Sequence, residues 1–300
     1  MLLNKKIWLF SLIMFLTSAA MPQDDLMNML EEDTPDTSYA DAIFKTTRVI
    51  QGHSVKSPSY GVLQFVVSHH FGRINQGLYN LFGLDQATIR LDLHYGITDR
   101  LAVGIGRSSY QKTLDGYVKY KLLRQSSGAR KMPVTASYLA AADINTLRWQ
   151  EPERDNLFSS RVSYVHQLLV ARKFNNKLSL QLTPTLVHKN LVETTEDRND
   201  IFATGLGGRY KITKNLSINA EYFHVFGKRN KPQYENALAI GVDLETGGHV
   251  FQLHLTNSQP MFERGFITET RGKWSNGDIY FGFNINRVFT IKEPKKFREE

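Results

Sequence analysis

Ser68, His69 and His70 are residue types that hydrolytic enzymes use as nucleophile and general base, and they stand together in the stretch "VSHHFG". They are consecutive in a segment whose apolar pattern predicts a strand, and successive side chains of a strand point to opposite faces. The three side chains therefore cannot converge on one substrate by themselves. We predict no catalytic residue.

Metal binding is a second chemistry to consider, because the chain has nine histidines. None of them shows the paired spacing of a zinc site. His94 and His254 fall on the same predicted side of their strands and could meet, but a hydrogen-bonded histidine is the more common situation. We predict no metal site and no cofactor.

Charged residues recur at every second position within apolar stretches. In "TIRLDLHYGI", Ile89 and Leu91 share one face, whereas Arg90 and Asp92 share the other, as the two-residue period of a strand dictates. If such strands close into a barrel, the charged face lines the lumen. Seven bases and four acids, besides one histidine, give that face a positive bias. The lumen-facing candidates are Arg90, Asp92, His94, Arg107, Lys119, Lys121, Arg161, Arg209, Lys211, Glu221, Asp243 and Glu245.

Similar alternating runs recur through most of the chain and predict twelve strands. An even number of strands returns both ends of the chain to the same side. The strands are predicted at residues 61–73, 87–98, 101–111, 116–124, 133–146, 158–172, 178–191, 201–212, 216–227, 236–246, 249–258 and 277–291.

The connections between these strands alternate in length. "TDR", "NNK", "TKN" and "TGG" are tight turns, and longer polar loops such as "RWQEPERDN" and residues 259–276 lie between them, with "RQSSGARK" and "KTLD" as exceptions. Long loops on one side and short turns on the other are typical of a transmembrane barrel with extracellular loops and periplasmic turns. A soluble β-sandwich is the alternative, but strands of ten or more residues favour the barrel. The predicted fold is an all-β, up-and-down antiparallel transmembrane β-barrel of about 12 strands at residues 59–291.

The N-terminus has the pattern of a secretory signal peptide at residues 1–20, with Lys5 and Lys6 before a short apolar core and cleavage expected near Ala20. An uncleaved membrane anchor is the alternative, but the core is too short to span a bilayer as a helix. The chain has no run of about 18 apolar residues, which excludes a helical membrane bundle. It also has no cysteine, so an exported fold must be stable without disulfides.

The net charge of +8 is unevenly distributed. Residues 1–23 carry two lysines, and residues 24–41 carry seven acids and no base, so residues 42–300 hold +13. A basic body suggests nucleic acid, but an exported protein rarely meets it. Outer-membrane lipid and small anions are the more suitable partners, together with a periplasmic or outer-membrane protein.

Residues 21–58 are predicted to form an N-terminal periplasmic segment. Its acidic stretch "DDLMNMLEEDTPD" is expected to be disordered, with a short amphipathic turn as the alternative. "AIFKTTRVIQGHSVKSP" mixes apolar and basic residues, so we expect it to fold back into the periplasmic mouth, where its bases reach Asp243 or Glu245. The alternatives are an extra strand or a surface linker. Residues 292–300 are predicted to form a C-terminal periplasmic tail.

Several blocks resemble an outer-membrane-type β-barrel family of Bacteroidota whose function is unknown. They include "FKTTRVIQGHSV", "FGLDQATIRLDLHYG", "LSLQLTPTLVHKNLV" and "ETGGHVFQLHLTNS", and the similarity runs from about residue 42 to residue 291. The resemblance implies an outer-membrane barrel and supplies no catalytic or binding residues.

The predicted function is therefore a small porin-like channel of the outer membrane with a positively biased lumen. The first alternative is a non-conducting structural or partner-binding barrel, because narrow barrels can be filled by their own side chains. A lipid hydrolase of the outer membrane is a remote alternative.

Overall fold

The structure is a computed structural model that describes residues 36–227 and 230–293. The chain divides into two units, residues 1–36 and residues 37–300, and only Asp36 of the first unit is described. The expected signal peptide, nearly all of the acidic stretch and residues 294–300 of the expected tail lie outside the described residues. Within the described residues, no helix is long and apolar enough to cross a membrane.

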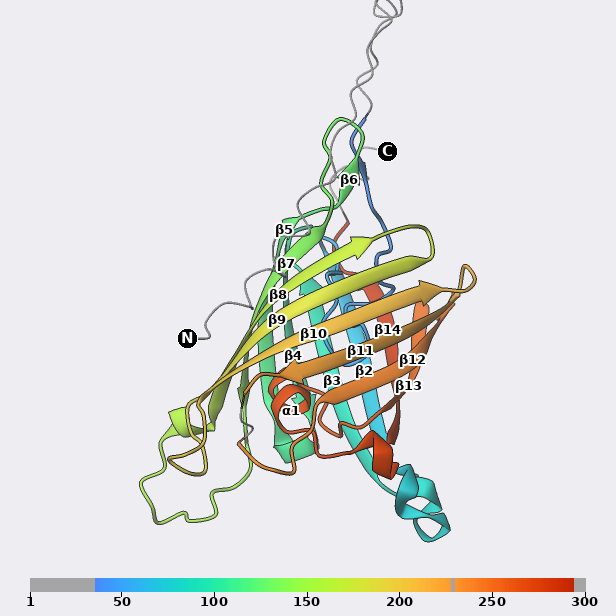
Figure 1. The fold of residues 1–300 in the computed structure, drawn as a ribbon. Coiled ribbons are helices and arrows are strands. Elements are labelled where there is room, and N and C mark those ends of the chain that lie inside the picture. Colours follow the sequence, from blue (N-terminus) through green and yellow to red (C-terminus); the bar gives the residue numbers. More distant parts are fainter. Residues whose placement is uncertain (1–35, 228–229, 294–300) are drawn as a thin grey trace, which may run out of the picture. The chain divides into compact units, whose positions relative to one another are not determined.

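Twelve strands form a closed barrel in which all neighbours are antiparallel, and strand β14 closes it against β2 (Figure 1). This confirms the predicted fold. The main difference is at β8, which begins at Val162 because Phe158–Arg161 forms a 3-10 turn. The strands are β2 Val62–Arg73, β3 Ala87–Gly96, β4 Leu101–Ser108, β5 Leu114–Leu123, β7 Thr135–Ile144, β8 Val162–Lys173, β9 Leu178–Lys189, β10 Asp200–Lys211, β11 Leu216–Val225, β12 Ala237–Thr246, β13 His249–Thr256 and β14 Tyr280–Thr290.

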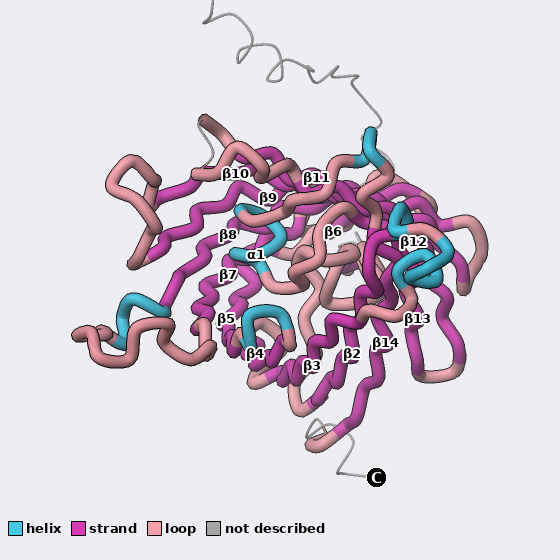
Figure 2. The backbone as a smooth tube through the Cα atoms, turned by 90° about the horizontal axis from the view of Figure 1, so that it is seen from below, coloured by secondary structure: helices cyan, strands magenta, loops and turns pink. Residues whose placement is uncertain are grey.

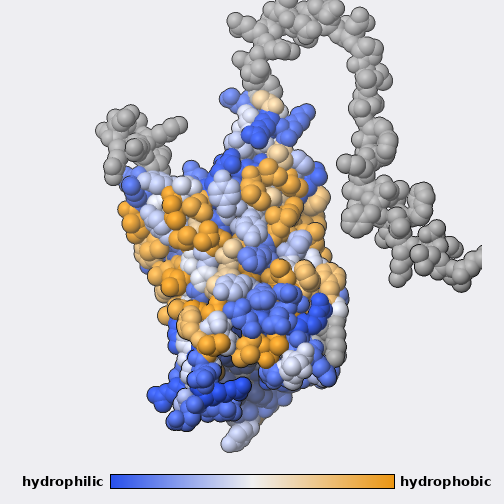
Figure 3. All heavy atoms as spheres, turned by 90° about the vertical axis from the view of Figure 1, so that its left-hand side faces the viewer, coloured by the Kyte–Doolittle hydropathy of each residue, from blue (hydrophilic) through white to orange (hydrophobic). Residues whose placement is uncertain are grey.

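The pleat of these strands places mainly polar side chains inside and mainly apolar side chains outside. In β3, Arg90 and Asp92 are each 1% exposed, whereas Leu91 is 45% exposed. A soluble barrel has the opposite distribution, and the exposed apolar band is typical of a barrel that contacts lipid. Figure 3 shows apolar side chains spread over one side of the wall and hydrophilic side chains over the protruding ends.

The two ends of the barrel differ in their connections. One end carries tight turns such as residues 97–100 and 174–177, together with the β5–β7 connection, where β6 (Ser126–Ser127) pairs with β1 (Ser38–Tyr39). The other end carries the long loops, including residues 145–161 and 257–279 (Figure 1). We call these the short-turn end and the long-loop end.

Two segments that are not strands occupy the lumen. The plug segment, residues 43–57, is buried except at Lys45 and Lys56. The inner loop, residues 257–270, is buried except at Gln259 and contains helix α1 (Glu263–Thr268). Figure 2, viewed from the long-loop end, shows α1 and loop backbone inside the ring of strands.

Candidate functional site

The carboxylate of Glu221, on the inner wall in β11, holds the tip of the plug segment. It accepts hydrogen bonds from the backbone N–H groups of Ile50 (3.3 Å), Gln51 (2.6 Å) and Gly52 (3.2 Å). A Cβ at position 52 would lie 2.9 Å from the ring of Phe223, so glycine permits this close approach. The tip is therefore shaped to fit this part of the wall.

Other wall side chains satisfy the backbone of the plug segment, which has no regular secondary structure there. Gln181 donates to the carbonyl of His53 (2.7 Å) and accepts from the N–H of Val55 (2.9 Å). Asn284 donates to the carbonyl of Ile50 (2.9 Å), and Lys119 donates to that of Lys56 (2.7 Å). Buried backbone groups need such partners, so the polar wall replaces the water that would otherwise solvate the segment.

A buried ion network joins the plug segment, the inner loop and the wall. Arg48 of the plug segment lies 3.0 Å from Glu263 of the inner loop and 3.6 Å from Asp92 of β3. Arg90 lies 2.7 Å from Asp92 and 2.6 Å from Asp115. Breaking one partner of such a network leaves an uncompensated buried charge, so the three parts stabilise one another.

Most of the predicted lumen residues lie on the inner face. Seven of them are buried there, namely Arg90, Asp92, His94, Lys119, Arg209, Glu221 and Asp243. Three others, Lys121, Lys211 and Glu245, share the inner face but are partly exposed at the short-turn end, where Glu245 forms an ion pair with Lys45.

Arg107 and Arg161 lie elsewhere, and their predicted placement was wrong. Arg107 shares the face of Ile105, and both side chains are exposed on the outside of β4. Arg161 belongs to the 3-10 turn that precedes β8, so it stands at the long-loop end and not on the barrel wall. For Arg107 the two-residue period was counted from the wrong residue, which assigned it to the wrong face of β4. For Arg161 the period was extended beyond the start of β8.

The sequence pattern missed five charged residues of the interior. Asp115 and Asp143 point inward from β5 and β7, and Glu263, Arg264 and Glu269 belong to the inner loop. Asp115 has the same parity as Lys119, so the period would have revealed it had the strand been started one residue earlier. With Arg107 and Arg161 removed from the predicted set and these five residues added, six bases stand against eight acids, so this set has no positive bias.

The side chains of Ser68, His69 and His70 are divided between the two faces of β2. Ser68 and His70 are buried on the inner face, whereas His69 faces outward. His254 lies 2.9 Å from His70 through their Nε2 atoms and does not meet His94, whose Nδ1 lies 2.6 Å from the hydroxyl of Tyr117. Among residues 36–227 and 230–293, no group of three or more potential metal ligands occurs.

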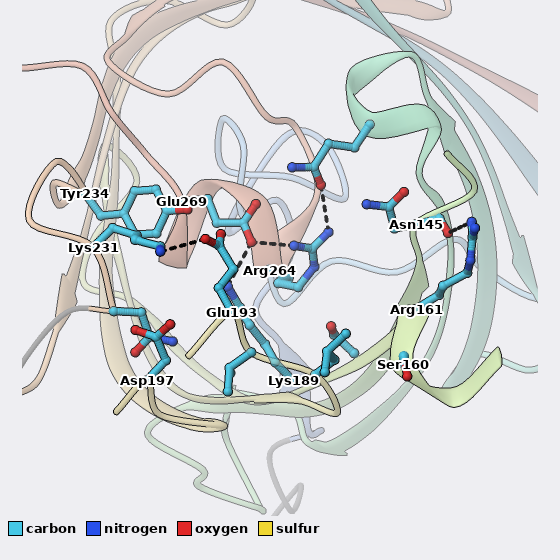
Figure 4. A pocket seen from close by; sticks show the side chains of 15 residues that line it. Asn145, Ser160, Arg161, Lys189, Glu193, Asp197, Lys231, Tyr234, Arg264 and Glu269 are labelled. Atoms are coloured by element: carbon cyan, nitrogen blue, oxygen red, sulfur yellow. Dashed lines mark hydrogen bonds and ion pairs between the residues drawn. The ribbon is translucent and has the colours of Figure 1, made fainter. Parts of the chain in front are cut away.

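The inner loop is anchored at the long-loop end by a second set of ion pairs (Figure 4). Arg264 lies 2.6 Å from Asp143 and 2.5 Å from Glu269, and Lys189 lies 2.8 Å from Glu269. Burial alone would raise the pKa of Glu269, but Arg264 and Lys189 outweigh it and lower that pKa to about 2.

Replacing Glu269 with glutamine is expected to loosen α1. A carboxylate whose pKa is lowered stabilises the fold above its ordinary pKa of 4.5, and this stabilisation is lost as the pH falls towards about 2. Acidification from pH 7 to pH 5 should therefore leave the protection of residues 262–270 against hydrogen exchange unchanged, once the pH dependence of intrinsic amide exchange is divided out. Loss of the charged partner should cost about 2 kcal/mol, which accelerates that exchange by about tenfold or more. Equal exchange in E269Q and wild type would contradict the anchoring role.

Two adjoining pockets open beside this anchor at the long-loop end. The first, of about 270 Å³, is lined by Lys189, Glu193, Lys231, Arg264 and Glu269 among others (Figure 4). The second, of about 360 Å³, lies under the loop of residues 145–161. Arg161 lines both pockets. They form a solvent-facing surface above a filled lumen.

Residues 44–289 match the family model described as "Membrane bound beta barrel domain (DUF5777)". Comparison with curated proteins gives no significant match. The barrel is similar to the NanC porin, with 9% identity, a TM-score of 0.49 and coverage of 77% of this chain and 100% of that one. An outer membrane channel from Pseudomonas putida F1 has 14% identity, a TM-score of 0.48 and coverage of 78% and 97%. The KdgM porin has 8% identity, a TM-score of 0.45 and coverage of 76% and 99%.

Proposed function

Because the chain belongs to the family of membrane-bound β-barrel domains known as DUF5777, we propose that it is an outer-membrane barrel that acts as a small channel closed at rest by its plug segment. The single observation that carries this proposal is the kind of wall that the plug segment covers. The expected signal peptide and the apolar outer face support the outer-membrane location.

The wall behind the plug segment is hydrophilic. The backbone of the segment is held by side chains such as Gln181, Glu221 and Asn284, all of which water can solvate as well. Withdrawal of the segment therefore exchanges protein hydrogen bonds for hydrogen bonds to water, at modest net cost per bond. The segment also buries apolar side chains against Leu169 and Ala171, and their exposure on withdrawal adds to this cost. These side chains are Ile43, Phe44, Val49 and Val55.

The wall behind the inner loop is apolar, in contrast. Phe266 and Ile267 of α1 are fully buried against it, and each contributes about 2 kcal/mol through burial. We therefore assign the inner loop a fixed role that narrows the lumen and keep the movable role for the plug segment. The apolar wall residues are Val165, Val187, Ile201, Ala203, Phe223, Val225 and Ala237.

Purified wild-type protein is expected to stay closed in planar bilayers, with rare and small conductance steps. Because Asp115 and Asp143 balance inward bases, these steps should discriminate only weakly between anions and cations. In fractionated cells the protein should be recovered with the outer membrane. The purified protein should migrate faster unheated than boiled, since a closed barrel has no edge from which detergent can unfold it. Steady large conductance would contradict closure at rest, and recovery as a soluble protein would contradict the location.

The alternative is a barrel that never conducts and serves as a structural or partner-binding protein. The buried network of Arg48, Asp92 and Glu263 favours it, because ion pairs on both sides of the plug segment resist withdrawal. A complete lack of openings after removal of the plug segment would favour this alternative.

A further inference from the structure

The loop between β7 and β8 surrounds a pocket that is rich in arginine. This pocket, of about 360 Å³, is lined by Arg148, Arg154 and Arg161, with Glu151 as its acidic residue and Trp149 as its large aromatic one. Three guanidinium groups against one carboxylate around a small volume give it a positive field.

Arg161 is fixed in place at the base of this loop. Its guanidinium lies 3.6 Å from the centre of the Trp149 ring, close enough for a cation–π contact. Its Nη1 atom donates to the carbonyl oxygen of Asn145 (2.9 Å) and to that of Leu147. The loop also holds itself together, because Asn156 donates to the carbonyl of Glu151 (2.8 Å). The pocket is therefore formed before any ligand arrives.

These three arginines differ from Lys189, Lys231 and Arg264, which line the neighbouring pocket. Lys189 and Arg264 are paired with Glu269, and Lys231 lies 2.6 Å from Glu193. In the described part of the chain, by contrast, no carboxylate forms an ion pair with Arg148, Arg154 or Arg161. Their charge is therefore available to a ligand.

We propose that this pocket binds a small anion through a phosphate or carboxylate group held by Arg148, Arg154 and Arg161. Guanidinium groups present paired N–H donors that match the oxygens of these groups, and charge-assisted hydrogen bonds of this kind are the strong ones. The site goes beyond the proposed channel function and is independent of whether the barrel conducts. The proposed anion site lies at the long-loop end, whereas the sequence pattern predicted the excess of positive charge in the lumen.

The test is calorimetric titration of the full-length protein in neutral detergent with inorganic phosphate, citrate and glucose. Phosphate or citrate should bind saturably and glucose should not. R154Q and R148Q, two changes at exposed positions, should each weaken binding by about tenfold, which is the loss of about 1.4 kcal/mol. R130Q removes an exposed loop arginine at the opposite end and should leave binding unchanged. Heat-modifiable migration of every variant checks that the barrel is folded.

Three outcomes would overturn the proposal. They are no saturable binding of phosphate or citrate, an affinity in R148Q and R154Q equal to that of the wild type, or a loss of affinity in R130Q as large as in those variants.

The anionic group has two sources, a free solute or the phosphate of a lipid headgroup. Phosphatidylglycerol added to the micelles should compete with phosphate if lipid is the source, and phosphatidylcholine serves as the control of zero net charge. Either result of this competition supports the anion site and identifies its source.

Discussion

A disulfide between positions 49 and 207 is expected to hold the barrel closed under every condition that opens the wild type. Gly207 lies in β10, and a Cβ built there is 3.8 Å from the Cβ of Val49 in the plug segment. This separation equals the mean Cβ–Cβ distance of about 3.8 Å in disulfides. The chain has no cysteine of its own, so V49C/G207C introduces a single possible bond.

The oxidised double variant should show no openings in planar bilayers, and a reducing agent should restore those of the wild type. The physical reason is that the plug segment can leave the lumen only if its contact with β10 breaks. G207C alone, treated with the same oxidant, is the matched control, because it carries the same change to the wall without the bond. Conductance that is equal before and after reduction, in protein shown to be cross-linked, would exclude the plug segment as the gate.

The twelve strands were predictable from the sequence because lipid contact imposes a strict rule on each of them. Every second side chain of β3 meets lipid and must be apolar, as Leu91 and Leu93 are, and the residues between them face a polar interior. This rule acts on each strand separately, so it can be read without knowledge of the rest of the fold. The short turns between strands are equally local.

The candidate site was only partly predictable, because its geometry depends on contacts that are distant in the sequence. Arg48 meets Glu263 across more than 200 residues, and α1 is a helix of six residues whose burial follows from the apolar wall around Phe223. No local period marks either feature. Asp143 was missed for another reason: the inner face of β7 also carries Leu139, so the contrast between its two faces is weak.

Deletion of residues 24–57 is expected to open the barrel without unfolding it. The deletion removes the plug segment and leaves the twelve strands, whose ladder is complete without it. Glu221 loses three backbone donors and Asn284 loses one acceptor, but both side chains then face a lumen that water can fill. The inner loop stays bound to the apolar wall, so the open lumen should remain narrow.

The measurement is conductance of the deletion variant in planar bilayers, compared with the wild type and with E221Q. Long openings should replace the closed state in the deletion variant. E221Q weakens the hold on the segment tip but keeps the segment, so its openings should be more frequent than those of the wild type and shorter than those of the deletion variant. Unheated migration of all three proteins reports whether the barrel is folded. A folded deletion variant that stays closed would reject the plug segment as the gate and favour the non-conducting barrel. Loss of the folded band would instead show that the barrel itself requires the buried network of Arg48, Asp92 and Glu263.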